Sequence, residues 1–186
     1  MQTALLESII FVGGTAAILY VSRASLRRIA SHGFYRFFAW ELLLLLFVLN
    51  MRKWLQEPFA PHQLTAWSLL FIALFLIFES AIRLRVQGAP SHTRIDDSLI
   101  SMEKTTRLVT GGIYRYIRHP MYSSLFFLGW GIFFKDPSWL GGILATAATI
   151  FLVLTARVEE HENIRFFGND YREYMKGTKM FVPFVF

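Results

Sequence analysis

Long apolar runs, separated by short polar segments, dominate this chain. Four of them approach the roughly 20 residues that a helix needs to cross the hydrocarbon core of a bilayer. These four runs are 4–21, 34–51, 64–84 and 139–156. A fifth run, 121–134, is shorter, and it reaches spanning length only if its helix begins near Tyr114 or if protein covers its cytoplasmic end. The pattern predicts an all-α, polytopic integral membrane protein with five transmembrane helices.

The basic residues predict how these helices are oriented in the membrane. Of the 19 Lys and Arg side chains, all except Arg52, Lys53 and Lys135 fall in segments on one side of the predicted spans. Lys and Arg are enriched on the cytoplasmic side, so we expect the N-terminus outside and a C-terminal helix in the cytoplasm. The net charge of +6 then reflects topology and anionic lipids, and no nucleic-acid partner is expected. We expect a bacterial or archaeal inner membrane in preference to the endoplasmic reticulum.

The composition narrows the chemistry further. Hydrophobic residues make up 54% of the chain, more than soluble domains usually contain. The absence of cysteine excludes disulfides and thiolate metal sites. The five histidines are scattered over both predicted membrane sides without the spacing of metal ligands. We therefore expect no bound metal.

The chain reads as a single membrane domain, 1–186, with three parts. Residues 1–85 form a three-helix scaffold, and 86–117 form a cytoplasmic loop whose most polar stretch is 91–97. Residues 118–186 form a helical hairpin with a C-terminal extension. Candidate chemistry is concentrated in this last part, which carries an ordered set of polar and aromatic residues.

That set begins before the fourth apolar run and continues after the fifth. It consists of Arg118, His119, Pro120 and Tyr122, then Glu159 and Glu160, and then Phe167, Gly168, Tyr171 and Tyr174. The order resembles that of the isoprenylcysteine carboxyl methyltransferase and phospholipid methyltransferase family of integral membrane enzymes. The resemblance implies methyl transfer from S-adenosylmethionine to a lipophilic or membrane-embedded acceptor. A lipid head group, or a lipophilic thiol, amine or carboxylate, would fit that description.

The resemblance also implies a cofactor site. Its residues would be Thr106, Arg107, Leu108, Val109, Tyr114, Arg118, His119, Pro120, Tyr122 and Glu159. A helix that starts at Pro120 presents free amide donors and a positive dipole end, which suit the methionine carboxylate of the cofactor. Either Arg118 or His119 adds a charged donor there. Glu159 accepts hydrogen bonds from ribose hydroxyls or the cofactor amino group, and the tyrosines offer aromatic faces to adenine or the sulfonium.

Four residues are candidates for the acceptor side and for catalysis: Arg157, Glu160, Glu79 and Glu41. Members of the family that act on prenylcysteine resemble one another in carrying an arginine four residues before the cofactor glutamate. Here that position is Thr155, and Arg157 is the candidate replacement. Glu41 and Glu79 are ionisable residues inside predicted spans, where they would wall the acceptor pocket or accept a proton. The alternative for Glu79 is a pair with Arg83, one helical turn away.

Other interpretations of the same residues stay open. Membrane sterol and enone reductases, which use NADPH, have a similar C-terminal arrangement but favour Asn where this chain has Met121. A non-enzymatic membrane scaffold or lipid-binding protein would also explain the spans. The aromatic residues Phe166, Phe167, Tyr171 and Tyr174 are expected to pack at the membrane interface and not to contact a cofactor. A soluble Rossmann-type methyltransferase is excluded, because no glycine-rich strand-to-helix motif is present.

Overall fold

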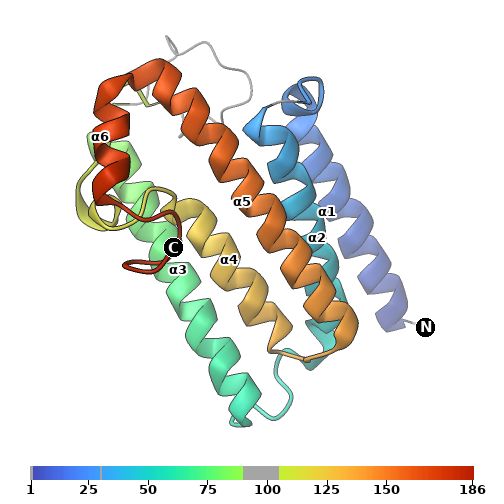
Figure 1. The fold of residues 1–186 in the computed structure, drawn as a ribbon. Coiled ribbons are helices and arrows are strands. Elements are labelled where there is room, and N and C mark those ends of the chain that lie inside the picture. Colours follow the sequence, from blue (N-terminus) through green and yellow to red (C-terminus); the bar gives the residue numbers. More distant parts are fainter. Residues whose placement is uncertain (1, 30, 90–104) are drawn as a thin grey trace.

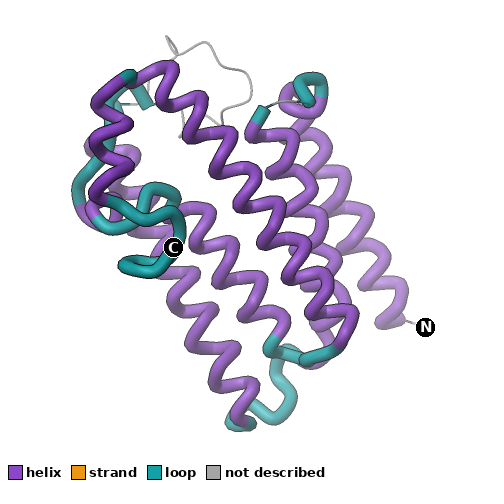
Figure 2. Tube along the Cα trace, viewed as in Figure 1, coloured by secondary structure: helices purple, strands orange, loops and turns teal. Residues whose placement is uncertain are grey.

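The computed structural model describes residues 2–29, 31–89 and 105–186 (Figure 1). Every regular element among them is a helix, and Figure 2 shows no strand in this described part. An isolated parallel bridge joins Ile117 to Lys179. The predicted all-α fold is therefore confirmed, whereas the polar stretch 91–97 lies outside the described residues.

In the described part of the chain, four helices are long and apolar enough to cross a membrane. They are α1 (Gln2–Leu26), α2 (His32–Asn50), α3 (Pro61–Gln87) and α5 (Trp139–Phe167). Side-chain caps help to start two of them, because Ser31 Oγ accepts from the backbone N–H of Phe34 and Ser138 Oγ from that of Gly141. These helices agree with the four longest apolar runs of the sequence.

The fifth apolar run forms a shorter helix, α4 (Pro120–Phe133), of 14 residues. It is about 21 Å long, less than the roughly 30 Å of a bilayer core. A helix starting near Tyr114 is therefore wrong: Gly112–Arg115 forms a separate 3-10 helix, η2. The cause is Pro120, which lacks an N–H and disfavours helical geometry in His119 before it. The φ and ψ of His119, −123° and 60°, are indeed non-helical.

Helix α5 extends well past the point at which its sequence turns polar. The apolar run stops at Ala156, but the helix continues to Phe167 and reaches 29 residues, about 44 Å. It ends at Gly168, whose φ of +64° lies in the left-handed region that glycine tolerates. The acidic turn that follows Ala156, which contains Glu159 and Glu160, therefore lies on a continuous helix. Helix α6 (Asn169–Gly177) begins after Gly168 and packs back against α5.

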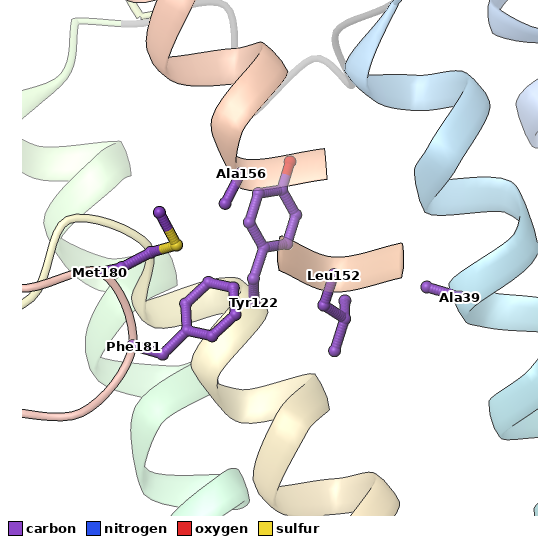
Figure 3. Close-up of a cluster of buried hydrophobic side chains, with 6 residues drawn as sticks. All are labelled: Ala39, Tyr122, Leu152, Ala156, Met180 and Phe181. Atoms are coloured by element: carbon purple, nitrogen blue, oxygen red, sulfur yellow. The ribbon is translucent and has the colours of Figure 1, made fainter. Parts of the chain in front are cut away.

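The helices pack in pairs, with α2 against α5 and α3 against α4, while α1 packs mainly against α2 (Figure 1). The C-terminal segment then returns to the start of α4. Lys179 O accepts from the backbone N–H of Arg118 at 2.8 Å, and Phe181 O accepts from Ser123 Oγ at 2.8 Å. Protein thus covers the N-terminal end of α4. Figure 3 shows Met180 and Phe181 of this segment beside Tyr122 of α4.

Candidate active site

A pocket lies where η2, the start of α4, the far end of α5 and α6 converge. Its empty space is about 590 Å³, counting open solvent at the mouth. The lining comprises Leu84, Thr105, Leu108, Val109, Tyr114, Arg118, His119, Pro120, Met121, Tyr122, Glu159, Asn163, Phe167, Tyr171 and Tyr174. Its polar groups come from the C-terminal part of the chain, although Leu84 of α3 closes one side.

Glu159 lies in the pocket beside Tyr122 of α4 and His119, the residue that precedes α4. The hydroxyl of Tyr122 donates to Glu159 Oε2 at 2.5 Å, and the ring of His119 stacks on that of Tyr122 at 5.6 Å. His119 Nδ1 lies 4.0 Å from the same carboxylate oxygen. In Figure 3 the Tyr122 ring stands between α4 and α5, with its hydroxyl directed along α5. A buried tyrosine thus orients a partly exposed carboxylate, which can accept hydrogen bonds from a ligand.

Arg118 joins three parts of the molecule. Its Nε donates to Glu160 Oε1 at 2.7 Å, and only 10% and 9% of the two side chains are exposed. Its Nη1 donates to the backbone oxygen of Thr178, in the C-terminal segment. His119 Nε2 lies 3.4 Å from Glu160 Oε1, so one carboxylate faces both members of the Arg-His pair. These contacts tie α4, α5 and the C-terminal segment together, and they occupy much of the hydrogen-bonding capacity of the guanidinium.

Aromatic side chains form the wall opposite α4. Tyr174 donates to the backbone oxygen of Tyr114 at 2.6 Å, and the Tyr114 hydroxyl lies 3.0 Å from Ser80 Oγ. Burial raises the pKa of Tyr171, and the nearby charge of Glu159 raises it further. Burial likewise raises the pKa of Tyr174. Both phenols therefore stay protonated at neutral pH and remain hydrogen-bond donors.

The structure brings most of the predicted cofactor residues together. Leu108, Val109, Tyr114, Arg118, His119, Pro120, Tyr122 and Glu159 all line the pocket. Thr106 and Arg107 do not: their backbone N–H groups donate to Gly88 O at 3.0 and 3.2 Å, and Thr105 lines the pocket in their place. The turn against Gly88 decides which residue of this segment points inward, and the sequence pattern carries no signal for it.

The pocket also contains residues that the sequence interpretation did not assign to it. Phe167, Tyr171 and Tyr174 line it, whereas Phe166, expected to pack like them at the membrane interface, is exposed. Asn163 is a further addition. A signal existed for Asn163, because it lies four residues after Glu159 and so shares its helix face. Tyr171 and Tyr174 reach the pocket only because the chain reverses its direction at Gly168, between α5 and α6.

The four candidate catalytic residues have different surroundings. Glu160 is paired with Arg118 beside the pocket, but Arg157 is exposed, because two residues turn a helix by about 200° away from the Glu159 face. Glu79 pairs with Arg83 at 2.8 Å, as the alternative interpretation expected. Glu41 accepts from Thr15 Oγ1 at 2.9 Å, between α1 and α2. The structure thus does not bring Arg157, Glu79 or Glu41 into the pocket lining.

Comparisons with known proteins bear on the same part of the chain. The family model for phospholipid methyltransferase matches residues 62–170, more than half of the sequence. The chain is 28% identical over 119 residues to the methanethiol S-methyltransferase of Pseudomonas deceptionensis, which covers 63% of this chain and 42% of the relative. It is 35% identical over 85 residues to the protein-S-isoprenylcysteine O-methyltransferase of Homo sapiens, covering 44% of this chain and 29% of the relative.

A third relative is the protein-S-isoprenylcysteine O-methyltransferase B of Arabidopsis thaliana, 33% identical over 90 residues, which cover 46% of this chain and 44% of the relative. In each case the chain spans less than half the length of the relative. No solved structure matches the chain significantly. The family match contains α4 and the whole of α5 with its acidic turn, where Tyr122 donates to Glu159. The chain belongs to the phospholipid methyltransferase family.

Proposed function

We propose that this protein transfers a methyl group from S-adenosylmethionine to a lipophilic or membrane-embedded acceptor. The observation that carries the proposal is Glu159, oriented by Tyr122 within an aromatic pocket inside the region of the family match. A carboxylate fixed in this way suits a ligand that carries hydroxyl and ammonium donors. The named activities of the relatives, methylation of methanethiol or isoprenylcysteine, support the class of reaction.

The residues of the pocket fit the parts of S-adenosylmethionine. Glu159 would accept from the ribose hydroxyls or the amino group. No side chain caps the N-terminus of α4, so its amide donors and dipole are available to the methionine carboxylate. Tyr114, Tyr171 and Phe167 supply aromatic faces for adenine or for the sulfonium.

The mechanism requires positioning more than covalent participation by the protein. When bound, S-adenosylmethionine supplies an activated methyl group on a good leaving group. The tasks left to the chain are to hold the acceptor in line and to exclude water. The C-terminal segment and the Arg118–Glu160 pair perform the second task by closing the pocket between α4 and α5.

An apolar groove between α3 and α4 offers the acceptor a route from the bilayer. It is lined by Trp54, Trp67, Leu70, Phe71, Ala73, Leu74, Ile77, Ser124, Leu125 and Leu128. Its residues on α4 continue the helix face of Met121, which lines the pocket one turn away. On α3, Leu84 of the pocket lies two turns beyond Ile77 of the groove. A molecule in the groove can therefore present its head to the pocket while its apolar part stays among hydrophobic side chains.

The proposal includes a finer topology with five spans, an external N-terminus and α6 on the cytoplasmic side of a bacterial or archaeal inner membrane. The charge distribution supports it, and so does the covered start of the short helix α4. Because the chain lacks cysteine, single-cysteine variants test it directly. A membrane-impermeant maleimide on intact cells should label Phe59→Cys, in the turn before α3, and should label Phe184→Cys only after lysis. The reverse pattern would overturn the orientation.

The function itself is tested by thermal-shift titration of the detergent-purified protein, since a ligand bound only by the folded state stabilises that state. S-adenosylmethionine and S-adenosylhomocysteine should both raise the thermal midpoint, and NADPH, as the matched control ligand, should not. A response to NADPH alone would favour the reductase. A response to none of the three would contradict the methyltransferase proposal and favour a non-enzymatic membrane protein.

A further inference from the structure

A buried lysine lies at the end of the groove that is farther from the pocket. Lys135, between α4 and α5, has 1% of its surface exposed. Its Nζ donates to Gln63 Oε1 at 2.9 Å and lies 3.2 Å from the centre of the Trp67 ring and 5.3 Å from that of Trp54. In the described part of the chain no carboxylate pairs with this ammonium. The cation is thus held by two aromatic faces and one amide oxygen.

Trp54, Trp67 and Gln63 thus form a cage around the ammonium of Lys135. The arrangement calls for an explanation, because burying an ammonium without a counter-ion costs free energy. Burial lowers the pKa of Lys135. The backbone of the lysine is held as well: Gln63 Nε2 donates to Lys135 O at 2.9 Å and to Lys53 O at 3.2 Å. The lysine therefore joins the α4–α5 turn, the start of α3 and the segment after α2.

The cage and the groove share two residues. Trp54 and Trp67 both line the groove, and their rings meet edge to face at 6.5 Å. Along α3 the groove runs from Trp67 to Ile77, and the pocket residue Leu84 lies beyond. The two tryptophans therefore form the end wall of a track about 25 Å long between Trp67 and Leu84. Cation–π attraction from Lys135 holds that wall in place.

We propose that Lys135 is a positioning residue that, through Trp54 and Trp67, limits the length of the apolar chain that the groove accepts. The occupant is the unbranched apolar chain of the methyl acceptor, because the groove residues Ser124 and Leu125 lie one turn along α4 from the pocket residue Met121. This inference rests on the proposed function for its substrate. Chains up to the length of the track bind with their heads at the pocket, and longer chains meet the tryptophan wall.

The first test measures binding without activity. A series of straight-chain fatty acids of increasing length, each with a terminal diazirine, is photolysed with the full-length protein in lipid nanodiscs, and mass spectrometry locates the labels. In the native chain, labelling of Leu70, Phe71 and Leu74 should rise with chain length and then fall. Lys135→Met and Trp67→Leu should each move that limit to longer chains. The second variant keeps the test decisive if the first does not fold.

The matched control is Trp139→Ala, which removes a tryptophan that is 93% exposed at the same end of the bundle but outside the groove. It should leave the length limit unchanged. Labels spread evenly over all lipid-facing helices would identify the occupant as ordinary bilayer lipid and overturn the proposal. Labels concentrated in the hollow between α4 and α5, around Ile143 and Ala147, would also overturn the proposal. So would a chain-length limit that changes in neither variant.

The second test separates this inference from the function on which it rests. Methyl transfer from S-adenosylmethionine to straight-chain alkanethiols of increasing length is measured for the native and variant chains. The ratio of long-chain to short-chain kcat/KM should rise at least about tenfold in Lys135→Met, whereas a merely structural role would lower both rates alike. If groove labelling is length-limited but no thiol is methylated, the proposed function fails for these acceptors while the groove limit stands. Methylation with an unshifted ratio overturns the role of Lys135 alone.

Discussion

Each end of the helix bundle holds a cation that is largely shielded from solvent, and the two ends hold it differently. At the pocket end, Arg118 is paired with the carboxylate of Glu160 and with a backbone oxygen of the C-terminal segment. At the opposite end, Lys135 lies among Trp54, Trp67 and Gln63. A planar guanidinium with five donors suits a network of oxygen acceptors, whereas a compact ammonium suits aromatic faces. The pocket end is thus equipped for polar ligands and the other end for apolar ones.

The largest effect is expected from breaking the ion pair. Arg118→Met leaves the nearly buried Glu160 without its arginine and should destabilise the fold by about 3–5 kcal/mol. The thermal midpoint in detergent measures this loss. Adding Glu160→Gln to the same chain should recover part of it, because the uncompensated charge is then gone. Arg115→Met, at an exposed arginine three residues away, is the control; equal losses in both variants would contradict a special role for Arg118.

A smaller effect is expected on ligand binding. Glu159→Ala removes the carboxylate that Tyr122 orients and should weaken S-adenosylhomocysteine binding roughly 10- to 100-fold, the usual range for lost hydrogen bonds to a charged group. Calorimetric titration of the folded variant gives the affinity. Glu173→Ala, whose side chain is 70% exposed on α6, should bind as the native chain does. Unchanged affinity in Glu159→Ala would remove the carboxylate from the proposed cofactor site.

The cage at the opposite end should tolerate substitution better than the ion pair. Lys135→Met removes the charge together with its desolvation cost, so only the cation–π contact and one hydrogen bond are lost, about 1–2 kcal/mol of stability. The same thermal measurement applies. A loss as large as that of Arg118→Met would show that the two ends of the bundle depend equally on their cations for stability.

The smallest effect is expected on α3. Glu79 and Arg83 are one turn apart and partly exposed, with 23% and 38% of their side chains accessible, so Glu79→Gln should change stability by less than about 0.5 kcal/mol. Methyl transfer should persist as well, because Glu79 lies outside the pocket lining. Loss of activity in a stable Glu79→Gln variant would restore the catalytic role that its position in a span first indicated.

Particular residues show how far the sequence interpretation reaches into the site. Pro120, Tyr122 and Glu159 were found because a family motif and helix-start chemistry both mark them. Thr105 was missed because its inward orientation follows from a turn against Gly88. The sequence predicts Tyr171 and Tyr174 at the membrane interface, since nothing in the local pattern distinguishes an aromatic residue that faces lipid from one that faces a pocket.

The sequence by itself determined the apolar helices, the family and the acidic turn after Ala156, because helix formation and membrane burial depend on local periodicity and hydrophobicity. Only the tertiary structure decided that α5 continues past Ala156, that α6 folds back to complete the pocket, and that Lys135 meets Trp67. Those contacts join residues distant in the chain. Their energies come from packing and charge compensation between helices, which no local pattern encodes.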